Sequence, residues 1–367
     1  MPLRLATFNV ENLLRRFDFS GFRRPDREDR VLKLFEIGDE AGYRRLEEAR
    51  MVGLADDTRQ HTALAIADCD ADIVCLQEVD DLQALEAFEG GYLYRMMGRG
   101  YPRKVLLPGN DGRGIDVALM LREETADGAA IEVGHVRSHA DATFASLDLL
   151  TPELAASERP EARLFRRDCL EVDLIVGGKP VTLYLVHFKS MGPARGGIDG
   201  RAATMPLRRA EALGVRRIIE RRFGAGLAQA RFAICGDMND YQEKILVEGS
   251  RREGYRFRPV AEEGSALDVF SRDGFAENVL TRLDAMERWT LFHTRGATER
   301  HLCQLDYIWL SQALSAANPQ ARPEIIRAGQ PFRTPFPPGQ EVERYPRIGW
   351  DRPKASDHCP VVVSLEI

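Results

Sequence analysis

The chain has 367 residues and a mass of 41.3 kDa, and 44% of its residues are hydrophobic. This length and apolar content suffice for one large domain or two ordinary ones, and they exclude a chain that is disordered throughout. No apolar run approaches the roughly 20 residues that a membrane span needs. The N-terminal stretch MPLRLATFNVEN lacks the basic, apolar and small-residue regions of a signal peptide. We therefore expect a cytoplasmic protein without a membrane span.

The net charge is −6, from 57 acidic and 51 basic residues, and the pI is about 5.8. This balance excludes a highly basic, histone-like binder of nucleic acid. The basic residues comprise 45 Arg and only six Lys. A guanidinium group matches phosphate oxygens well, but a general preference for Arg at surface positions explains the bulk of them.

The six cysteines predict buried, reduced thiols. Cys75, Cys235 and Cys359 lie in or beside apolar segments that resemble strands, and the sequence contains no CxxC pair. Free cysteines of a cytosolic protein are commonly buried. The spacing also gives no zinc site.

The first third of the chain predicts strands separated by helices. Residues 3–10 form an expected strand, and residues 17–52 are charged, with helical pieces at 29–36 and 43–51. An amphipathic helix is expected over 58–68. The apolar run DIVCLQEV, which follows it directly, is typical of a strand buried on both faces, and a short helix follows at 82–88.

The remainder of the chain continues this mixture. GIDVALML predicts a strand, residues 138–162 a loop, and LEVDLIV with VTLYLVHF a hairpin. A long helix is expected over 205–223, and strands in RFAICGD, QLDYIWLS and PVVVSLEI. Residues 241–290 show no clear pattern. Residues 318–353 are rich in Pro and aromatic residues without periodicity, which indicates a functional loop. Neither a repeat nor a composition break divides the chain, so mixed α/β architecture is expected.

Polar residues gather where the predicted strands end. Asn9, Glu78, His187, Asp237, Asn239, Asp357 and His358 all occupy such positions. Each alone has a structural explanation, such as a capped turn or a buried histidine with satisfied hydrogen bonds. Because loops at strand ends present polar groups above a rigid sheet, the whole set predicts one ligand site.

These residue types suit metal-assisted hydrolysis of a phosphoester. Hard divalent cations prefer oxygen ligands such as Glu78, Asp357 and the Asn9 carbonyl. A carboxylate near an amide, as in Asp237 and Asn239, can hold a water nucleophile or a phosphate oxygen. A histidine oriented by a buried carboxylate can act as an acid or a base, or donate to the phosphoryl oxygen.

Seven motifs give the chain a specific resemblance to a known family. They occur in family order from the first strand to the last: TFNVEN at 7–12, LQEV at 76–79, NDGRGIDVALM at 110–120, LVHFKS at 185–190, CGDMND at 235–240, QLDYIWLS at 304–311 and SDHCPV at 356–361. On these motifs the chain resembles the endonuclease/exonuclease/phosphatase superfamily. The resemblance implies an α/β four-layer sandwich, with two mixed β-sheets packed face to face and helices outside. It also implies a single domain over 1–367, with insertions at about 15–55 and 318–353.

The resemblance assigns metal and catalytic roles. Glu78 resembles the main ligand of Mg²⁺ (or Mn²⁺), supported by Asn9 and Asp357. Asp237 and Asn239 match the pair that positions the attacking water and the phosphate. His358 matches the histidine that contacts the scissile phosphate, with Asp306 as its orienting carboxylate.

Further positions match the family less closely. His187 matches a second histidine of deoxyribonuclease-like and sphingomyelinase-like members, and apurinic endonucleases usually lack it. Arg113 resembles a phosphate-contacting arginine, so the expected phosphate contacts are Arg113, Asn239 and His358. Asp116 is expected to be structural, and Lys189 and Ser190 to shape the strand end.

Three functions remain open at this stage. The first is a divalent-metal phosphodiesterase of the nuclease type, with nucleic acid as the partner. The second is a phosphatase or phosphodiesterase for a small-molecule, nucleotide or lipid-headgroup phosphoester, which the net acidity favours slightly. The third, a non-catalytic binding module, conflicts with the retention of every catalytic motif. The sequence leaves the substrate, the number of metals and the oligomeric state open.

The two insertions bear on this choice. Residues 15–55 and 318–353 adjoin Asn9 and Asp357, and both carry Arg beside aromatic residues. One hypothesis is that they wall the site into a pocket for a short or small phosphoester. The alternative is that their aromatic residues pin long loops to the body of the protein.

Overall fold

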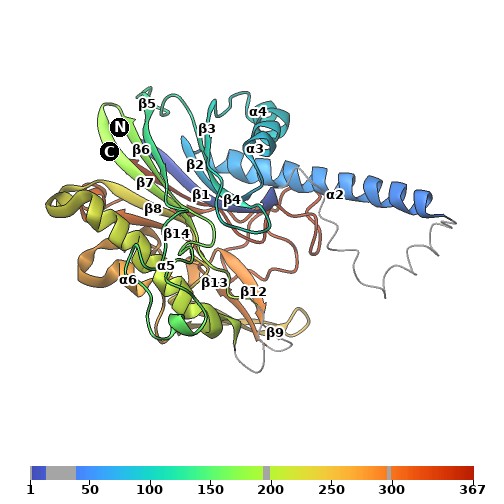
Figure 1. Ribbon diagram of the computed structural model, residues 1–367. Helices are drawn as coiled ribbons and strands as arrows, with labels where there is room; N and C mark the ends of the chain where they lie inside the picture. Colours follow the sequence, from blue (N-terminus) through green and yellow to red (C-terminus); the bar gives the residue numbers. More distant parts are fainter. Residues whose placement is uncertain (1, 14–38, 193–198, 296–298) are drawn as a thin grey trace.

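The computed structural model describes residues 2–13, 39–192, 199–295 and 299–367, without the side chains of Tyr43, of residues 45–55 and of Arg295. Two six-stranded sheets form its centre, and helices lie on their outer faces (Figure 1). Within the described residues, no helix combines the length and the apolar content that a membrane crossing requires. The fold is the four-layer α/β sandwich that the motifs imply.

The first sheet joins the two ends of the chain. β1 (Pro2–Leu13) lies at its centre, antiparallel to β16 (Val361–Glu366) and parallel to β2 (Ile73–Val79). The strand order is β15-β16-β1-β2-β4-β3, with β4 at Asp116–Leu121, β3 at Arg103–Leu106 and β15 at Glu324–Ile325. The strands predicted at 3–10, 72–79, 114–121 and 360–367 are confirmed.

The second sheet contains the predicted hairpin. β6 (Cys169–Val176) and β7 (Lys179–His187) are antiparallel neighbours, and β8 (Phe232–Asp237) runs parallel to β7. The strand order is β11-β14-β8-β7-β6-β5, with β14 at Asp306–Ser311, β11 at Ala276–Asn278 and β5 at Ile131–Ser138.

A third, four-stranded antiparallel sheet was not predicted. Its order is β10-β9-β13-β12, formed by β9 (Glu243–Ser250), β10 (Gly254–Ala261), β12 (Leu291–Arg295) and β13 (Glu299–Cys303). These strands lack a clear sequence pattern because β10 has no fully buried residue and β9 only two, Ile245 and Val247. A strand with so little buried surface has a weak apolar alternation.

The helices cover the two sheets. α2 (Glu40–Cys69) is a single helix over the predicted pieces at 43–51 and 58–68, and its N-terminal half extends beyond the body of the protein (Figure 1). The predicted helix at 29–36 lies outside the described residues. α5 ends at Phe223 as expected but begins at Gly200, because Asp199 caps it and accepts the backbone N–H groups of Arg201 and Ala202 at 2.9 and 3.1 Å. The remaining α-helices are α3 (Leu82–Phe88), α4 (Tyr94–Met97), α6 (Asp268–Ser271) and α7 (Gln312–Ala317).

Apolar layers lie between these elements. One cluster fills the space between the two large sheets and includes Leu5 and Cys75 from the first and Leu183 and Ile308 from the second. A second cluster lies between the first sheet and α2, and a third between the second sheet and α5. All six cysteines are buried and free, as predicted. These layers hold the strand ends in fixed positions.

Candidate active site

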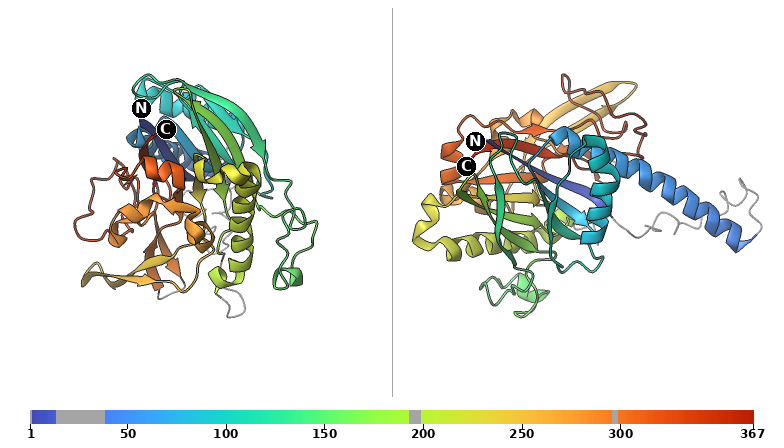
Figure 2. Two further views of the ribbon diagram at one scale, coloured as in Figure 1. Left: turned by 90° about the vertical axis from the view of Figure 1, so that its left-hand side faces the viewer. Right: turned by 90° about the horizontal axis from the view of Figure 1, so that it is seen from above.

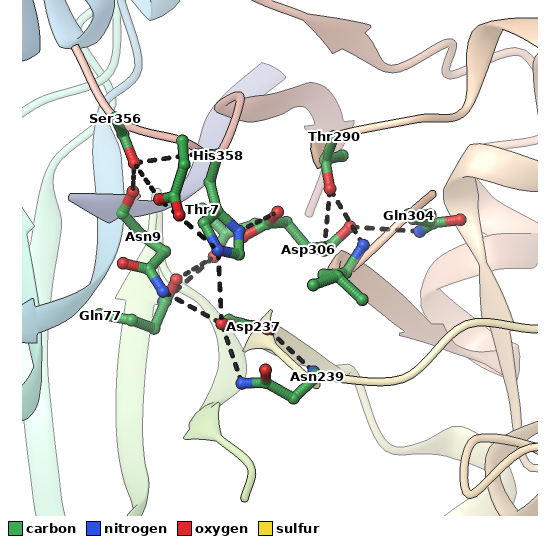
Figure 3. Close-up of polar contacts among 12 residues, drawn as sticks. Thr7, Asn9, Gln77, Asp237, Asn239, Thr290, Gln304, Asp306, Ser356 and His358 are labelled. Carbon is green, nitrogen blue, oxygen red and sulfur yellow. Dashed lines mark hydrogen bonds and ion pairs between the residues drawn. The ribbon is translucent and has the colours of Figure 1, made fainter. Parts of the chain in front are cut away.

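The expected site residues converge where strands of both large sheets end. Asn9 lies on β1 and Glu78 on β2 of the first sheet, while His187 ends β7, Asp237 ends β8 and Asp306 begins β14 of the second. Ser356, Asp357 and His358 precede β16, and Figure 3 shows Ser356 and His358 on the side of Asn9 opposite to Asn239. The parallel pairs β1–β2 and β7–β8 bring these ends together.

Irregular backbone aims several of these side chains. Glu78 has a φ of 69°, at a point where the pairing of β2 with β4 shifts register between Gln77 and Val79. Asn239 has a φ of 50°. Positive φ values are strained for residues other than glycine, and bulges of this kind redirect side chains near functional sites. The sandwich therefore departs from regular strand geometry at its candidate site.

A glycine brings β8 close to β7 immediately before Asp237. Gly236 has a φ of 145°, and a Cβ atom at this position would lie 1.9 Å from the carbonyl oxygen of Val186. Only glycine permits this approach, which sets Asp237 beside His187.

His358 and Asp306 form the predicted pair. The Nδ1 atom of His358 lies 2.8 Å from Oδ2 of Asp306, and both side chains are buried. Thr290 fixes both partners: its hydroxyl accepts the N–H of Asp306 at 3.2 Å, and its carbonyl accepts the N–H of Cys359 at 2.7 Å. Burial disfavours the charged imidazole, but the charges of Asp306 and Asp237 outweigh burial and raise the pKa of His358 well above its usual value.

Asp237 lies at the centre of the polar network. It accepts the Asn9 side-chain amide at 3.0 Å and the backbone N–H of Asn239 at 2.8 Å (Figure 3). Its Oδ2 atom lies 3.5 Å from Nε2 of His187 and 3.8 Å from Nε2 of His358. Burial raises the pKa of Asp237 to about 7, although the charge of His358 opposes that shift.

His187 stays neutral in this environment. Burial lowers its pKa well below the usual value, and the positive charges of Arg167 and His358 add to the effect. Its Nε2 atom lies 3.5 Å from Asp237 and 3.9 Å from Oε1 of Glu78. A neutral imidazole between two carboxylates can donate one hydrogen bond without adding charge.

Glu78 and Asp357 are the carboxylates that suit a divalent cation. Burial and the nearby charge of Asp357 raise the pKa of Glu78. The described residues contain no group of three or more His, Cys, Asp or Glu side chains arranged to hold an ion by themselves. Mg²⁺ commonly uses one or two carboxylates and keeps several waters. Two repelling carboxylates beside the Asn9 amide therefore fit such an ion.

Other predicted residues lie around this cluster. Arg113 is at its edge, where Asp111 accepts its guanidinium at 3.1 and 3.2 Å, and its charge acts on Glu78. Asp116 accepts the N–H of Gly109 at 2.8 Å, which supports a structural role. The Lys189 ammonium lies 3.4 Å from the Ser190 hydroxyl at the end of β7.

Three residues of the site received no role from the sequence. Glu11 accepts the N–H of Asp357 at 3.0 Å and pairs with Lys354 at 3.0 Å. The Ser356 hydroxyl donates to the carbonyl of Asn9 at 2.7 Å. Gln330 donates to the carbonyls of Ser356 and His358 at 3.3 and 3.1 Å. Glu11 lies in the motif TFNVEN and Ser356 in SDHCPV, so their positions at strand ends could have identified them. Gln330 lies in a segment without periodicity, and no sequence pattern around it indicates a role.

Comparison with known proteins identifies the family of this chain. The model of the Endonuclease/Exonuclease/phosphatase family matches residues 6–358. The chain therefore belongs to this family, whose members hydrolyse phosphoesters. A search of curated proteins found no match.

Solved structures share the fold at low sequence identity. A truncated TDP2 from Caenorhabditis elegans aligns with a TM-score of 0.51 and 13% identity, covering 100% of this chain and 98% of that one. An endonuclease/exonuclease/phosphatase family protein from Bacteroides thetaiotaomicron aligns with a TM-score of 0.51 and 14% identity, covering 100% and 97%. The human Nocturnin catalytic domain with bound sulfate gives 0.50 and 14%, covering 100% and 94%.

Proposed function

We propose that this protein is a divalent-metal-dependent hydrolase that uses water to cleave a phosphodiester, in the manner of a nuclease. The convergence of Asp237 with the His358–Asp306 pair, beside the carboxylates of Glu78 and Asp357, carries the proposal. Membership of the family supports phosphoester hydrolysis as the reaction class.

Asp237 acts as the general base. Its pKa of about 7 lies near neutral pH, where a base is both deprotonated in part and able to take a proton from water. The amides of Asn9 and Asn239 hold the carboxylate in one orientation. With its backbone and its side chain anchored on Asp237, Asn239 also orients the phosphate.

His358 stabilises the charge that develops on the phosphoryl oxygen. The Asp306 carboxylate accepts its Nδ1–H, so Nε2 carries the second proton and can donate to the substrate. His187 supplies a neutral donor next to the base, and Arg113 adds a positive charge at the edge of the site.

Glu78, Asp357 and Asn9 would hold the ion, Mg²⁺ or Mn²⁺. When bound, such an ion acts as a Lewis acid that polarises a phosphoryl oxygen. The protein contributes the negative charge that retains the ion and the hydrogen bonds that keep Asp237 in place.

The alternative is a phosphatase or phosphodiesterase for a small-molecule, nucleotide or lipid-headgroup phosphoester. For the segment 318–353, the two hypotheses were that it walls the site and that its aromatic residues pin it to the body of the protein. Tyr345 donates to Asp68 at 2.7 Å and Arg347 pairs with Asp57 at 2.9 Å, so both pin the segment to α2. Phe332 and Trp350 of the same segment remain exposed. The aromatic residues of 15–38 lie outside the described residues.

A substrate panel tests the proposal. Wild-type protein would be assayed with Mg²⁺ or Mn²⁺ on bis-p-nitrophenyl phosphate, single-stranded and plasmid DNA, RNA and inositol phosphates. The Asp237→Asn variant, purified in parallel, controls for contaminating nuclease. We expect hydrolysis of diesters that excess EDTA abolishes and that the variant loses. Full activity in EDTA, or equal activity in the variant, would contradict the proposal. A steep decline of DNA cleavage with salt would favour nucleic acid over a small phosphoester.

A further inference from the structure

A cavity lies outside the catalytic cluster. It has a volume of about 230 Å³ and lies between the β9–β10 hairpin and the segment 318–353, which are on the same side of the molecule (Figure 2, right). Its lining combines aromatic rings with two arginines: Tyr255, Phe332, Phe336, Trp350, Arg251 and Arg344. None of the catalytic side chains contributes to it.

Two of these rings are unusually exposed. Phe332 is 53% exposed and Trp350 is 57% exposed. Among the described residues, seven large hydrophobic side chains are exposed, and three of them fall between positions 332 and 350. Burial of an aromatic ring away from water is energetically favourable. Two exposed rings beside one cavity therefore indicate a surface that binds a ligand.

Arg344 is built into the floor of this cavity. Its guanidinium carbon lies 4.8 Å from the ring centre of Phe332 and 4.4 Å from that of Phe336. Its Nε and Nη2 atoms donate to the carbonyls of Gln330 and Thr334 at 2.9 and 3.1 Å. No carboxylate of the described residues pairs with it, and burial alone lowers its pKa.

The balance of charge in the cavity favours an anion. The guanidinium carbon of Arg251 lies 5.9 Å from the ring centre of Trp350, and Arg251 also lines the cavity. One carboxylate, Glu341, also lines the cavity, but it accepts the N–H of Gly339 at 2.8 Å within its own loop. The two guanidinium groups can bind a phosphate, while the aromatic rings stack against a flat group of the same ligand.

The cavity is connected to the catalytic cluster through one residue. Gln330 accepts the Arg344 Nε–H with its carbonyl, and its side chain donates to the carbonyls of Ser356 and His358. The backbones around Phe332 and Trp350 are also joined, since Phe332 N–H donates to Gly349 at 3.0 Å. Arg344 and Gln330 therefore link the cavity to the segment that carries His358.

We propose that this cavity binds an unpaired nucleotide, with its base stacked on Trp350 and Phe332 and its phosphate near Arg251. The inference rests on the proposed function, because the nucleotide would flank the phosphoester that the catalytic cluster cleaves. The cavity is smaller than the roughly 300–1,000 Å³ of whole small-molecule sites, so it fits one ring system. A base inside a duplex has both faces stacked already and cannot enter.

The test measures binding separately from hydrolysis. Labelled hexathymidylate would be titrated in EDTA, which prevents turnover, and its anisotropy recorded for wild-type protein, Trp350→Ala and Phe332→Ala. Tyr94→Ala is the matched control, because Tyr94 is an aromatic residue on α4 with the same 53% exposure as Phe332. Trp289 and Trp309 are each 1% exposed, so quenching of tryptophan emission by the ligand would report on Trp350.

We expect each cavity variant to weaken hexathymidylate binding about 5- to 150-fold, the range for losing one stacked base. Binding by Tyr94→Ala, and hydrolysis of bis-p-nitrophenyl phosphate by every variant, should stay at the wild-type level. A duplex of equal length should bind without dependence on Trp350. Thymidine monophosphate tests whether the cavity binds a free nucleotide or a nucleotide within a strand. Binding as tight as that of hexathymidylate would identify a free nucleotide. Much weaker binding would identify a strand.

Wild-type affinity in both cavity variants, or equal losses for duplex and single strand, would overturn the inference. If the diester is still hydrolysed in that case, the proposed function survives. If binding depends on Trp350 but the wild-type protein hydrolyses no phosphoester, the inference of a nucleotide-binding cavity is supported and the proposed function is contradicted.

Discussion

Replacing Asp116 by Asn should stabilise the protein at neutral pH. Asp116 begins β4, is only 8% exposed and accepts the N–H of Gly109 at 2.8 Å. Burial raises the pKa of its carboxyl to about 6, and the negative charges of Asp168, Asp111 and Asp80 add to the shift. An Asn side chain can keep the hydrogen bond from Gly109 while removing the charge.

The magnitude follows from linkage. A pKa raised from 3.8 to about 6 corresponds to about 3 kcal/mol at roughly 1.4 kcal/mol per unit. Residual solvent screening reduces this to about 1–3 kcal/mol. The folded state binds the proton more tightly than the unfolded state, so this contribution to stability is fully present below about pH 4. It is lost as the pH rises through about 6, where the variant should become the more stable protein.

Urea unfolding followed by circular dichroism between pH 4 and 7.5 would measure the difference. The free energies of unfolding should be similar near pH 4 and should diverge by about 1–3 kcal/mol at pH 7. Diester hydrolysis should persist in the variant, because Asp116 lies outside the catalytic cluster. A variant that is less stable at every pH, or a difference that does not change with pH, would refute the reasoning.

Three predictions concern the catalytic cluster. Glu78→Gln should raise the Mg²⁺ concentration needed for half-maximal activity by at least about 10–100-fold, measured by metal titration after EDTA treatment. His358→Ala should lower kcat by about 10²–10⁴ and Asp306→Asn by less, with KM nearly unchanged in both, since Asp306 acts through His358. An Asp306→Asn loss larger than that of His358→Ala would contradict this order. Asp237→Asn should lower kcat on every cleaved diester, and near wild-type turnover in steady-state assays would exclude the base role.

The central strands could be predicted because they are buried on both faces. β2, β4, β8 and β14 are nearly continuous apolar runs, and such runs leave few alternatives to an interior strand. The polar residues that end these runs are the ones that the structure brings together, so their positions in the chain predicted which side chains converge. The third sheet was not predicted because one of its two outer strands, β10, has only exposed or half-buried side chains.

The details of positioning could not be read from the sequence. The positive φ of Glu78 is unusual for a glutamate, and nothing in the segment LQEV indicates it. Gln330 contacts a segment 26–28 residues further along, across a stretch without periodicity. Thr290 joins β14 to the segment before β16 through hydrogen bonds that form only when the sandwich is assembled.

The charge of the site supplies a further reason for a cation. Glu78, Asp237, Asp306 and Asp357 formally contribute four negative charges, and His358 contributes one positive charge within the same cluster. A phosphoester anion would meet a net negative field there, which the low effective dielectric of a buried site strengthens. Arg113, at the edge and held by Asp111, cannot compensate for this alone. A divalent ion held by Glu78 and Asp357 would change this formal sum from −3 to −1 and would add positive charge where the phosphate must bind, while leaving Asp237 free to accept a proton. The excess of carboxylates therefore supports the proposal that the site works with a divalent metal ion.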